Sequence, residues 1–352
     1  MKLLPFNDYD LKTPRILEAL NEASRSLAEL KGFANSIPNQ HILINAITIN
    51  EAKDSSAIEN IVTTHDSIYK ILTESGYKDE SAKEVVDYRS AIWRGFEIIK
   101  EKEFISTNVL VELQGMIEHN KAGVRKNPGT KLVNSKTREV IYTPPQEEKE
   151  IRDLLKNLED YINKTDDEVD PLIKMTLIHY QFESIHPFYD GNGRTGRILN
   201  VLYLVLQNKL SLPILYLSKY INSTKNEYYK CLYDMRVDDI YIKNYLLYMI
   251  RGVEYTSDFT LAFISKFRGA MENCKALLKK KNSKLYSEEL VEYLFFDFYT
   301  KNEYLRNALS ISRNTASKYL SELETIGILT SEQVGKEKIY KNNYLYELMK
   351  EW

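Results

Sequence analysis

The twelve residues from His186 to Arg197 bring several chemically active groups together in one short stretch. They read HPFYDGNGRTGR and include an imidazole, a carboxylate, a turn with two glycines and two arginines. Gly191 and Gly193 leave backbone N–H groups unshielded, and the helical pattern that follows adds unpaired N–H donors and the positive end of a helix dipole. The stretch therefore predicts a binding site for a polyphosphate.

Four side chains in this stretch have defined chemical capacities. Arg194 and Arg197 lie three positions apart, hence on one helix face, and their forked guanidinium groups match phosphate oxygens. Asp190 can hold Mg²⁺ on the phosphates through a single carboxylate. His186 can take a proton from an attacking hydroxyl group.

Other interpretations of these residues are weaker. The segment from Gly191 to Gly196 formally fits the dinucleotide-binding pattern GxGxxG, but a helical segment and a proline precede it instead of a strand, and the ribose carboxylate is missing. The segment from Gly123 to Lys131 misses the P-loop spacing. In a purely structural interpretation, His186 caps a helix and the two arginines form surface ion pairs. The other histidines lack a metal-ligand spacing and are expected to be structural: His41, His65, His119 and His179.

The composition is that of an ordinary globular protein. A chain of 352 residues predicts two or three domains, and 43% hydrophobic with 28% charged residues argues against a disordered, collagenous or membrane-spanning protein. The formal charge of −2 offers no global attraction to nucleic acid. Two cysteines without a CxxC spacing fit a reducing compartment, and no signal-like segment is present at the start. We therefore expect a cytoplasmic protein.

The pattern of the chain predicts a mainly α fold. Few glycines and prolines favour long helices, and apolar residues recur at helical spacing up to about Ile105. Short β-type runs at Lys131–Val133 and Glu139–Tyr142 predict a small hairpin. Asp170 as N-cap and Pro171 at the first position predict a helix that ends before Pro187. An almost wholly apolar helix is expected directly after Gly193.

The last part of the chain has the pattern of a winged helix. A turn and an amphipathic helix at Ser310–Leu323 precede two short strands around a tight turn. Ser312, Arg313, Asn314, Ser317 and Lys318 are placed as a recognition helix would expose them, and Lys336 and Lys338 lie on the expected wing. These residues could contact DNA. Since nearby glutamates dilute the positive charge, docking of a protein target or a dimer partner is the alternative.

The stretch from His186 to Arg197 resembles the motif HxFx(D/E)GNGRxxR of the Fic (filamentation induced by cAMP) proteins and matches it throughout. Gly123-Val124-Arg125, with Val140, Ile141 and Tyr142 and then Pro144-Pro145, resembles the Fic flap hairpin, which holds a target segment by strand addition. The segment Lys225–Leu232 resembles the helix that closes the adenosine pocket. The resemblance spans essentially the whole chain.

The resemblance implies AMPylation, the transfer of AMP from ATP to a protein Tyr, Thr or Ser hydroxyl group. It implies that His186 is the base, that Asp190 binds Mg²⁺ and that Phe188 anchors the loop. Asn192 and the glycine amides would hold the α-phosphate, and the two arginines the β- and γ-phosphates. The nucleotide-binding residues would be Gly191, Asn192, Gly193, Arg194, Thr195, Gly196, Arg197, Tyr228 and Arg236, with Val140, Ile141 and Tyr142 in the target-docking flap.

An inhibitory motif also resembles the family. SSAIEN, from Ser55 to Asn60, matches (S/T)xxxE(G/N), and Ser55 and Glu59 lie on one helix face. In the family this glutamate pairs with the second arginine of the loop motif, here Arg197, and takes the place of the γ-phosphate. An ordinary solvated glutamate is the alternative. By the same logic, Glu59 could position a water for removal of AMP.

These observations predict three parts: a helical region with the inhibitory helix at 1–105, a Fic core at 106–255 and a winged helix-turn-helix at 256–352. We expect an autoinhibited protein adenylyltransferase that can modify itself, with a homodimer as an open alternative and no membrane contact. The rival from another class is a DNA-binding regulator with a nucleotide-sensing core, indicated by salt-dependent duplex binding without covalent transfer. A third alternative keeps the fold but uses another donor.

Overall fold

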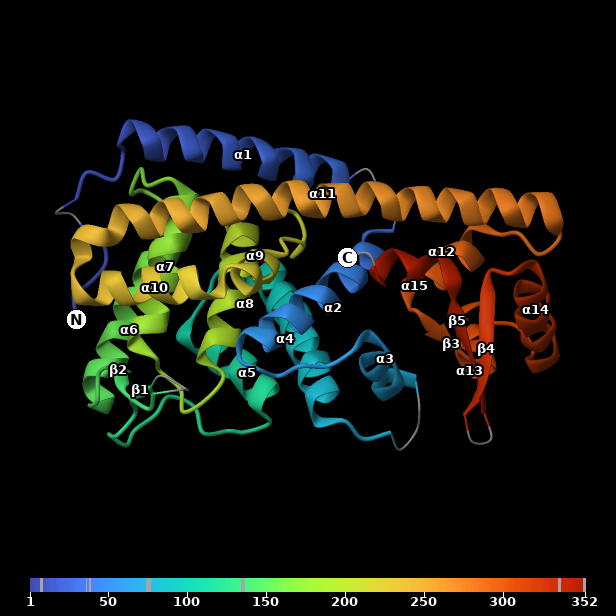
Figure 1. The fold of residues 1–352 in the computed structure, drawn as a ribbon, viewed down its shortest axis with the longest axis horizontal. Coiled ribbons are helices and arrows are strands. Elements are labelled where there is room, and N and C mark those ends of the chain that lie inside the picture. Colours follow the sequence, from blue (N-terminus) through green and yellow to red (C-terminus); the bar gives the residue numbers. More distant parts are fainter. Residues whose placement is uncertain are drawn as a thin grey trace. The chain divides into compact units, whose positions relative to one another are not determined.

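The structure is a computed structural model that describes residues 1–6, 9–35, 37, 39–73, 77–133, 137–334 and 337–350. It is mainly helical with two small antiparallel sheets (Figure 1), which confirms the predicted fold class. Internal contacts divide the chain into two compact units. The first contains Met1–Gly32, Thr48–Val62 and Glu84–Asp258; the second contains Phe33–Ile47, Thr63–Lys83 and Phe259–Trp352.

The first unit is a helical bundle that contains the HPFYDGNGRTGR stretch. Its apolar spacing explains how the helices pack: α6, for example, buries Ile151, Leu154, Leu155, Leu158 and Ile162 on one face. The helices that contribute to this unit are α1 (Pro14–Ala34), α2 (Gln40–Ile58), α4 (Glu80–Lys102), α5 (Thr107–Glu118), α6 (Glu148–Asn163), α7 (Pro171–Ile185), α8 (Asn192–Leu206), α9 (Leu217–Ser223), α10 (Lys225–Val237) and α11 (Ile242–Lys281). The units divide α1, α2, α4 and α11 between them.

Helices α7 and α8 form the centre of this bundle, where they pack against each other. Every residue of α7 from Leu172 to Ile185 is buried. The predicted start of α7 is confirmed: Pro171 is its first residue, and the Asp170 side chain accepts a hydrogen bond from the Leu172 N–H group at 2.8 Å. Because both helices are enclosed, the loop between them is held at each end by a rigid element.

The predicted hairpin is present as β1 (Leu132–Val133) and β2 (Val140–Tyr142), paired antiparallel. The turn residues 134–136 lie outside the described part of the chain. Val140 and Ile141 are exposed, whereas Tyr142 is half-buried. This hairpin therefore presents a short, open strand edge and apolar side chains to solvent.

The second unit contains α3 (His65–Thr73), α12 (Glu288–Phe296), β3 (Tyr299–Thr300), α13 (Asn302–Ala308), α14 (Arg313–Ile326), β4 (Leu329–Val334), β5 (Glu337–Asn342) and α15 (Asn343–Lys350). Strands β3, β5 and β4 form one sheet in that order. The Ser312 side chain caps α14, and Gly327 ends it with a φ of 89°. The predicted order of helix, helix and hairpin is confirmed. Lys336 lies outside the described residues.

No helix in the described residues is both long and apolar enough to cross a membrane.

Candidate active site

His186 directly follows the C-terminus of α7 and adopts a left-handed backbone conformation with a φ of 48°. Its N–H group donates to the Phe182 carbonyl at 3.0 Å and closes the last turn of the helix. The ring Nδ1 atom is buried and has no hydrogen-bond partner among the described residues. Burial, together with the positive charges of Arg236 and Arg125, lowers the pKa of His186 to about 4. The imidazole is therefore held neutral at physiological pH, as a base requires.

The loop that follows is tied to itself by the Asn192 side chain. Its amide donates to the Phe188 carbonyl and accepts from the Phe188 N–H group, both at 2.9 Å. The Phe188 ring is fully buried and lies 6.1 Å from the Phe182 ring. Phe188 thus occupies the position of the predicted anchor. The Asn192 side chain holds the loop's own backbone, and its contact with the α-phosphate stays a prediction.

Gly191 and Asp190 form the turn at the start of α8. Gly191 has a φ of 77°, which favours glycine, and the Asp190 carboxylate accepts from the Gly191 N–H group at 2.8 Å. The Asp190 side chain is exposed, and its carbonyl accepts from Gln114 of α5 at 3.2 Å. A side chain at position 191 would collide with Glu118, 2.7 Å from the added Cβ atom. The predicted turn at a helix N-terminus is present, and α8 begins at Asn192.

Arg194 is buried in an acidic setting that the sequence did not reveal. It donates to Glu84 of α4 at 2.7 Å and to Glu118 of α5. Burial raises the pKa of Glu118, and Asp190 and Glu84 repel its charge. Arg194 is thus held by two carboxylates, while the sequence indicated phosphate contacts for both arginines.

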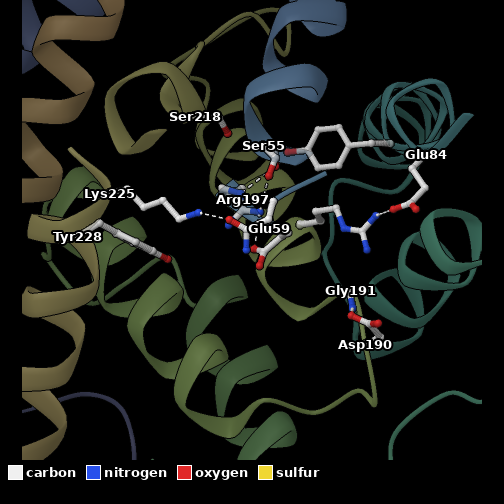
Figure 2. A network of polar contacts seen from close by, with 12 residues as sticks. Ser55, Glu59, Glu84, Asp190, Gly191, Arg197, Ser218, Lys225 and Tyr228 are labelled. Atoms are coloured by element: carbon white, nitrogen blue, oxygen red, sulfur yellow. Dashed lines mark hydrogen bonds and ion pairs between the residues drawn. The ribbon is translucent and has the colours of Figure 1, made fainter. Parts of the chain in front are cut away.

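Arg197 is the point where the inhibitory motif and the loop motif meet (Figure 2). Its Nε atom donates to the Ser55 hydroxyl at 2.7 Å, and its Nη2 atom donates to the Ser55 carbonyl at 2.9 Å and to Glu59 Oε1 at 2.8 Å. A Cβ atom on Gly193 would lie 2.3 Å from Glu59 Oε1, so Glu59 closely approaches the turn. Although burial acts in the opposite sense, the Arg197 charge holds the pKa of Glu59 below its usual value.

The rest of α2 is anchored by buried carboxylates. Glu51 accepts from the Ser218 N–H group at 2.9 Å, from the Ser218 hydroxyl and from the Tyr88 hydroxyl at 3.2 Å. Asp54 accepts from the Tyr216 hydroxyl and from Asn222 at 3.1 Å. These bonds fix the helix that presents Ser55 and Glu59 to Arg197.

The expected nucleoside side of the site is formed by α7 and α10. The Tyr228 hydroxyl lies 2.8 Å from His179 Nε2, and both side chains are buried. Glu183 of α7 lies under Gly196, where an added Cβ atom would be 2.7 Å from its Oε1 atom. That oxygen has no partner among the described residues, and burial raises the pKa of Glu183 to about 7. Nothing in the sequence marks Glu183 except its position three residues before His186.

Arg236 and Thr195, two other predicted site residues, have their own contacts within the chain. Arg236 of α10 donates to the Glu183 carbonyl at 2.9 Å, and its guanidinium group lies over the Tyr142 ring at 4.4 Å. Thr195 is fully buried, and its N–H group donates to the Gly191 carbonyl within the first turn of α8. These contacts do not test whether either residue binds a nucleotide, so both predicted contacts stay predictions.

The described fold places a glycine-containing turn between two buried helices, with the neutral imidazole of His186 at the end of α7 and an ion pair of Arg197 on α8 with Glu59. Three family models match this chain: "Fic/DOC family N-terminal" at residues 17–97, "Fic/DOC family" at residues 104–204 and "Protein adenylyltransferase SoFic-like, C-terminal domain" at residues 270–345. Together they span most of the chain. The chain belongs to the Fic family.

Two curated relatives are similar to this chain over shorter stretches than the three family models together. "Protein adenylyltransferase fic-1" of Caenorhabditis elegans is 29% identical over 141 residues, which is 39% of this chain and 25% of that protein. "Probable protein adenylyltransferase aq_aa38" of Aquifex aeolicus is 42% identical over 57 residues, 16% of this chain and 18% of that protein. The chain thus matches a quarter or less of the length of these relatives.

A solved structure is similar over almost the whole chain. The crystal structure of a Fic family protein from Desulfovibrio desulfuricans G20 superposes with a TM-score of 0.58 and 18% identity, covering 95% of this chain and 97% of that chain. At this identity the likeness concerns the fold. It agrees with the mainly helical architecture described above.

Proposed function

We propose that this protein is a protein adenylyltransferase that transfers AMP from ATP to a Tyr, Thr or Ser hydroxyl group of a protein. The observation that carries the proposal is the placement of His186 at the end of α7, and of Asp190 and Arg197 around the N-terminus of α8, in a Fic family chain. The relatives named as protein adenylyltransferases support the same activity.

In the proposed reaction, His186 takes the proton of the target hydroxyl group. The hydroxyl oxygen then forms a bond to the α-phosphorus of ATP, and the bond from that phosphorus to the pyrophosphate oxygen breaks. The first N–H groups of α8, which lack acceptors within the helix, would stabilise the charge that develops on the α-phosphate. Rate would come mainly from positioning and electrostatics.

Asp190 is the residue that would hold Mg²⁺. Among the described residues, no three His, Cys, Asp or Glu side chains gather as in an all-protein metal site. One exposed carboxylate beside an anion turn nevertheless fits Mg²⁺, since this ion usually takes its other ligands from phosphate and water. When bound, the ion would supply positive charge to the phosphates.

Glu59 would inhibit the transfer of AMP. Its carboxylate occupies the Arg197 guanidinium group that a terminal phosphate would otherwise take, and it lies close to Gly193 at the anion turn. A triphosphate and Glu59 therefore compete for the same positive charge. Activity would require that Glu59 leave Arg197, and self-modification is expected once it does.

Ser55→Ala is expected to relieve the inhibition by Glu59 in part. The substitution removes the acceptor of the Arg197 Nε–H bond, while the Ser55 carbonyl and Glu59 remain. Loss of about 1 kcal/mol predicts a rate of AMP transfer about fivefold above wild type. Ser56→Ala is the matched control, because Ser56 is equally buried and its hydroxyl has no partner among the described residues. Equal rates in the two variants would contradict a role for Ser55.

The pH dependence of transfer follows from the neutral state of His186. Since its pKa lies at about 4, below the usual 6.5, the base form persists as pH falls and is lost only near pH 4. We expect transfer by a Glu59→Gly variant to be nearly constant from pH 7 to about pH 5 in a stopped radiometric assay. An acid limb centred near pH 6.5 would show an exposed, ordinary histidine instead.

The donor can be tested by labelling. ATP labelled at the α-phosphate is expected to leave label on protein, and ATP labelled at the γ-phosphate is not. Label from the γ-position would indicate phosphate transfer, and label from another nucleotide alone would indicate a different donor. Incubation of AMP-modified protein with wild type would reveal the alternative activity, removal of AMP.

The part of the chain with the winged-helix pattern, residues 256–352, is proposed as a contact surface. Lys318 lies 3.8 Å from Glu322, and Lys338 lies 2.9 Å from Glu324. These glutamates neutralise part of the positive charge that DNA binding would need. This favours a protein target or a second copy of the chain over DNA. Absence of salt-dependent binding to a duplex would agree. A cytoplasmic location remains part of this proposal.

A further inference from the structure

The carbonyl groups at the C-terminus of α7 are all bonded, although a helix end leaves its last carbonyls without intrahelical partners. Tyr142 of β2 donates its hydroxyl to the Ser184 carbonyl at 3.0 Å, and Arg236 donates to the Glu183 carbonyl at 2.9 Å. Arg125 donates its Nη2 atom to the Ile185 carbonyl at 3.2 Å and its Nε atom to the His186 carbonyl at 2.8 Å. Three different segments thus cap the helix that ends in His186.

Arg125 has the most contacts in this cap. Its backbone N–H group also donates to the Pro187 carbonyl at 2.9 Å, and its Nη2 atom donates to the Pro145 carbonyl after the hairpin. One residue therefore binds the carbonyls of three consecutive residues, Ile185, His186 and Pro187. These bonds hold the His186 backbone in its left-handed conformation.

A buried arginine in this position needs a physical reason. Arg125 is fully buried and makes no ion pair with a carboxylate among the described residues, and burial lowers its pKa. Carbonyl groups and the negative end of the α7 dipole offset its charge, as cations near a helix C-terminus do. A neutral side chain would fill the same space without the cost of desolvating a charge.

The imidazole of His186 lacks the usual means of orientation. In many catalytic sites a carboxylate binds the second ring nitrogen of the base, but Nδ1 of His186 has no partner in the described residues. The position of the ring is therefore set without a carboxylate, and the conformation of its backbone contributes to it. The charged groups that act on the ring are Arg236 of α10 and Arg125, which oppose protonation, and Glu59 beyond α2, which favours it. The Glu183 carbonyl of α7 also favours protonation.

We propose that Arg125 is a positioning residue for His186: it fixes the backbone that carries the imidazole, and its guanidinium group, with that of Arg236, places positive charge at the end of α7. This inference rests on the proposed function, because it concerns the base of that reaction. It also connects the flap hairpin to the base, since the same guanidinium group binds Pro145.

The test uses the full chain with Glu59→Gly as the parent. Arg125→Gln removes the charge and most of the bonds, so transfer should fall about tenfold to a hundredfold, and the acid limb of its pH profile should move up by about one unit. Arg125→Lys keeps the charge but cannot bind several carbonyls at once, so transfer should fall while the limb stays. Arg152→Gln is the matched control, because Arg152 is exposed and pairs with Glu148 on α6.

A second measurement is independent of activity. In NMR titrations of ¹³C-labelled histidine, with His186→Ala for assignment, the His186 midpoint should rise in Arg125→Gln but not in Arg125→Lys or Arg152→Gln. If the parent transfers no AMP, the proposed function fails while this titration still decides the role of Arg125. Turnover by Arg125→Lys at the rate of the Glu59→Gly parent, or an unchanged His186 midpoint in Arg125→Gln, would overturn the inference. If Arg125→Gln does not fold, Arg236→Gln replaces it in the titration.

Discussion

Glu59→Gly is expected to raise AMP transfer on the order of a hundredfold. This corresponds to a coupling free energy of about 2–3 kcal/mol between Glu59 and ATP, within the usual range of about 1–3 kcal/mol for coupled sites. The substitution removes the carboxylate that lies 2.8 Å from Arg197 and crowds Gly193. Arg197 then becomes available to the terminal phosphates of ATP. The measurement is the initial rate of label transfer from α-labelled ATP to protein, together with the affinity of the protein for ATP.

Glu103→Gly is a matched control for this substitution. Glu59 directly follows α2 and Glu103 directly follows α4, so both are glutamates just beyond a helix C-terminus. Glu103 is exposed and takes no part in the ion pairs described for the site. The control should transfer at the wild-type rate. A folded Glu59→Gly protein that transfers AMP no faster than Glu103→Gly would refute inhibition by Glu59.

His186→Ala, made in the Glu59→Gly background, is expected to lower transfer about 10²- to 10⁴-fold, the usual contribution of a general base. The base is lost while the anion turn remains, because Asn192 and Arg125 hold the loop through backbone groups. ATP affinity should therefore change little. Loss of transfer with retained binding is the pattern that separates a base from a residue that binds ATP.

His41→Ala serves as the control for this change, since His41 is exposed at the start of α2 in the other unit. Its transfer rate should equal that of the parent. If His186→Ala keeps the parent's rate, the proton must be taken by another group. Glu183, a buried carboxyl with a pKa of about 7, would then be the next residue to test.

Much of the fold could be predicted because its signals are local. Asp170, Pro171 and Pro187 mark the two ends of α7, and the apolar sequence after Gly193 marks α8. Contiguous motifs were equally informative for the site: the loop motif places His186 and Asp190 around one turn, and the inhibitory motif led to the pair of Glu59 and Arg197. The second of these rested on a family resemblance, since no spacing rule joins residues 138 positions apart.

The residues that the sequence analysis missed act across long sequence separations. Glu84 and Glu118 are charged residues on helix faces, which usually point to solvent, and only the packing of α4 and α5 shows that they hold Arg194. Arg125 was noted as part of the hairpin segment, but its bonds to the end of α7 depend on tertiary structure. The three predicted domain boundaries stay a prediction beside the two units described here.

The central claim is that a protein of this family transfers AMP and is restrained by Glu59. Intact-mass spectrometry of wild type, Glu59→Gly and Glu59→Gly/His186→Ala after incubation with ATP and Mg²⁺ tests it most directly. The account predicts a mass gain of one AMP group confined to Glu59→Gly. An equal gain in wild type, or a gain that survives His186→Ala, would contradict it, and absence of any gain with added target proteins would favour the nucleotide-sensing alternative.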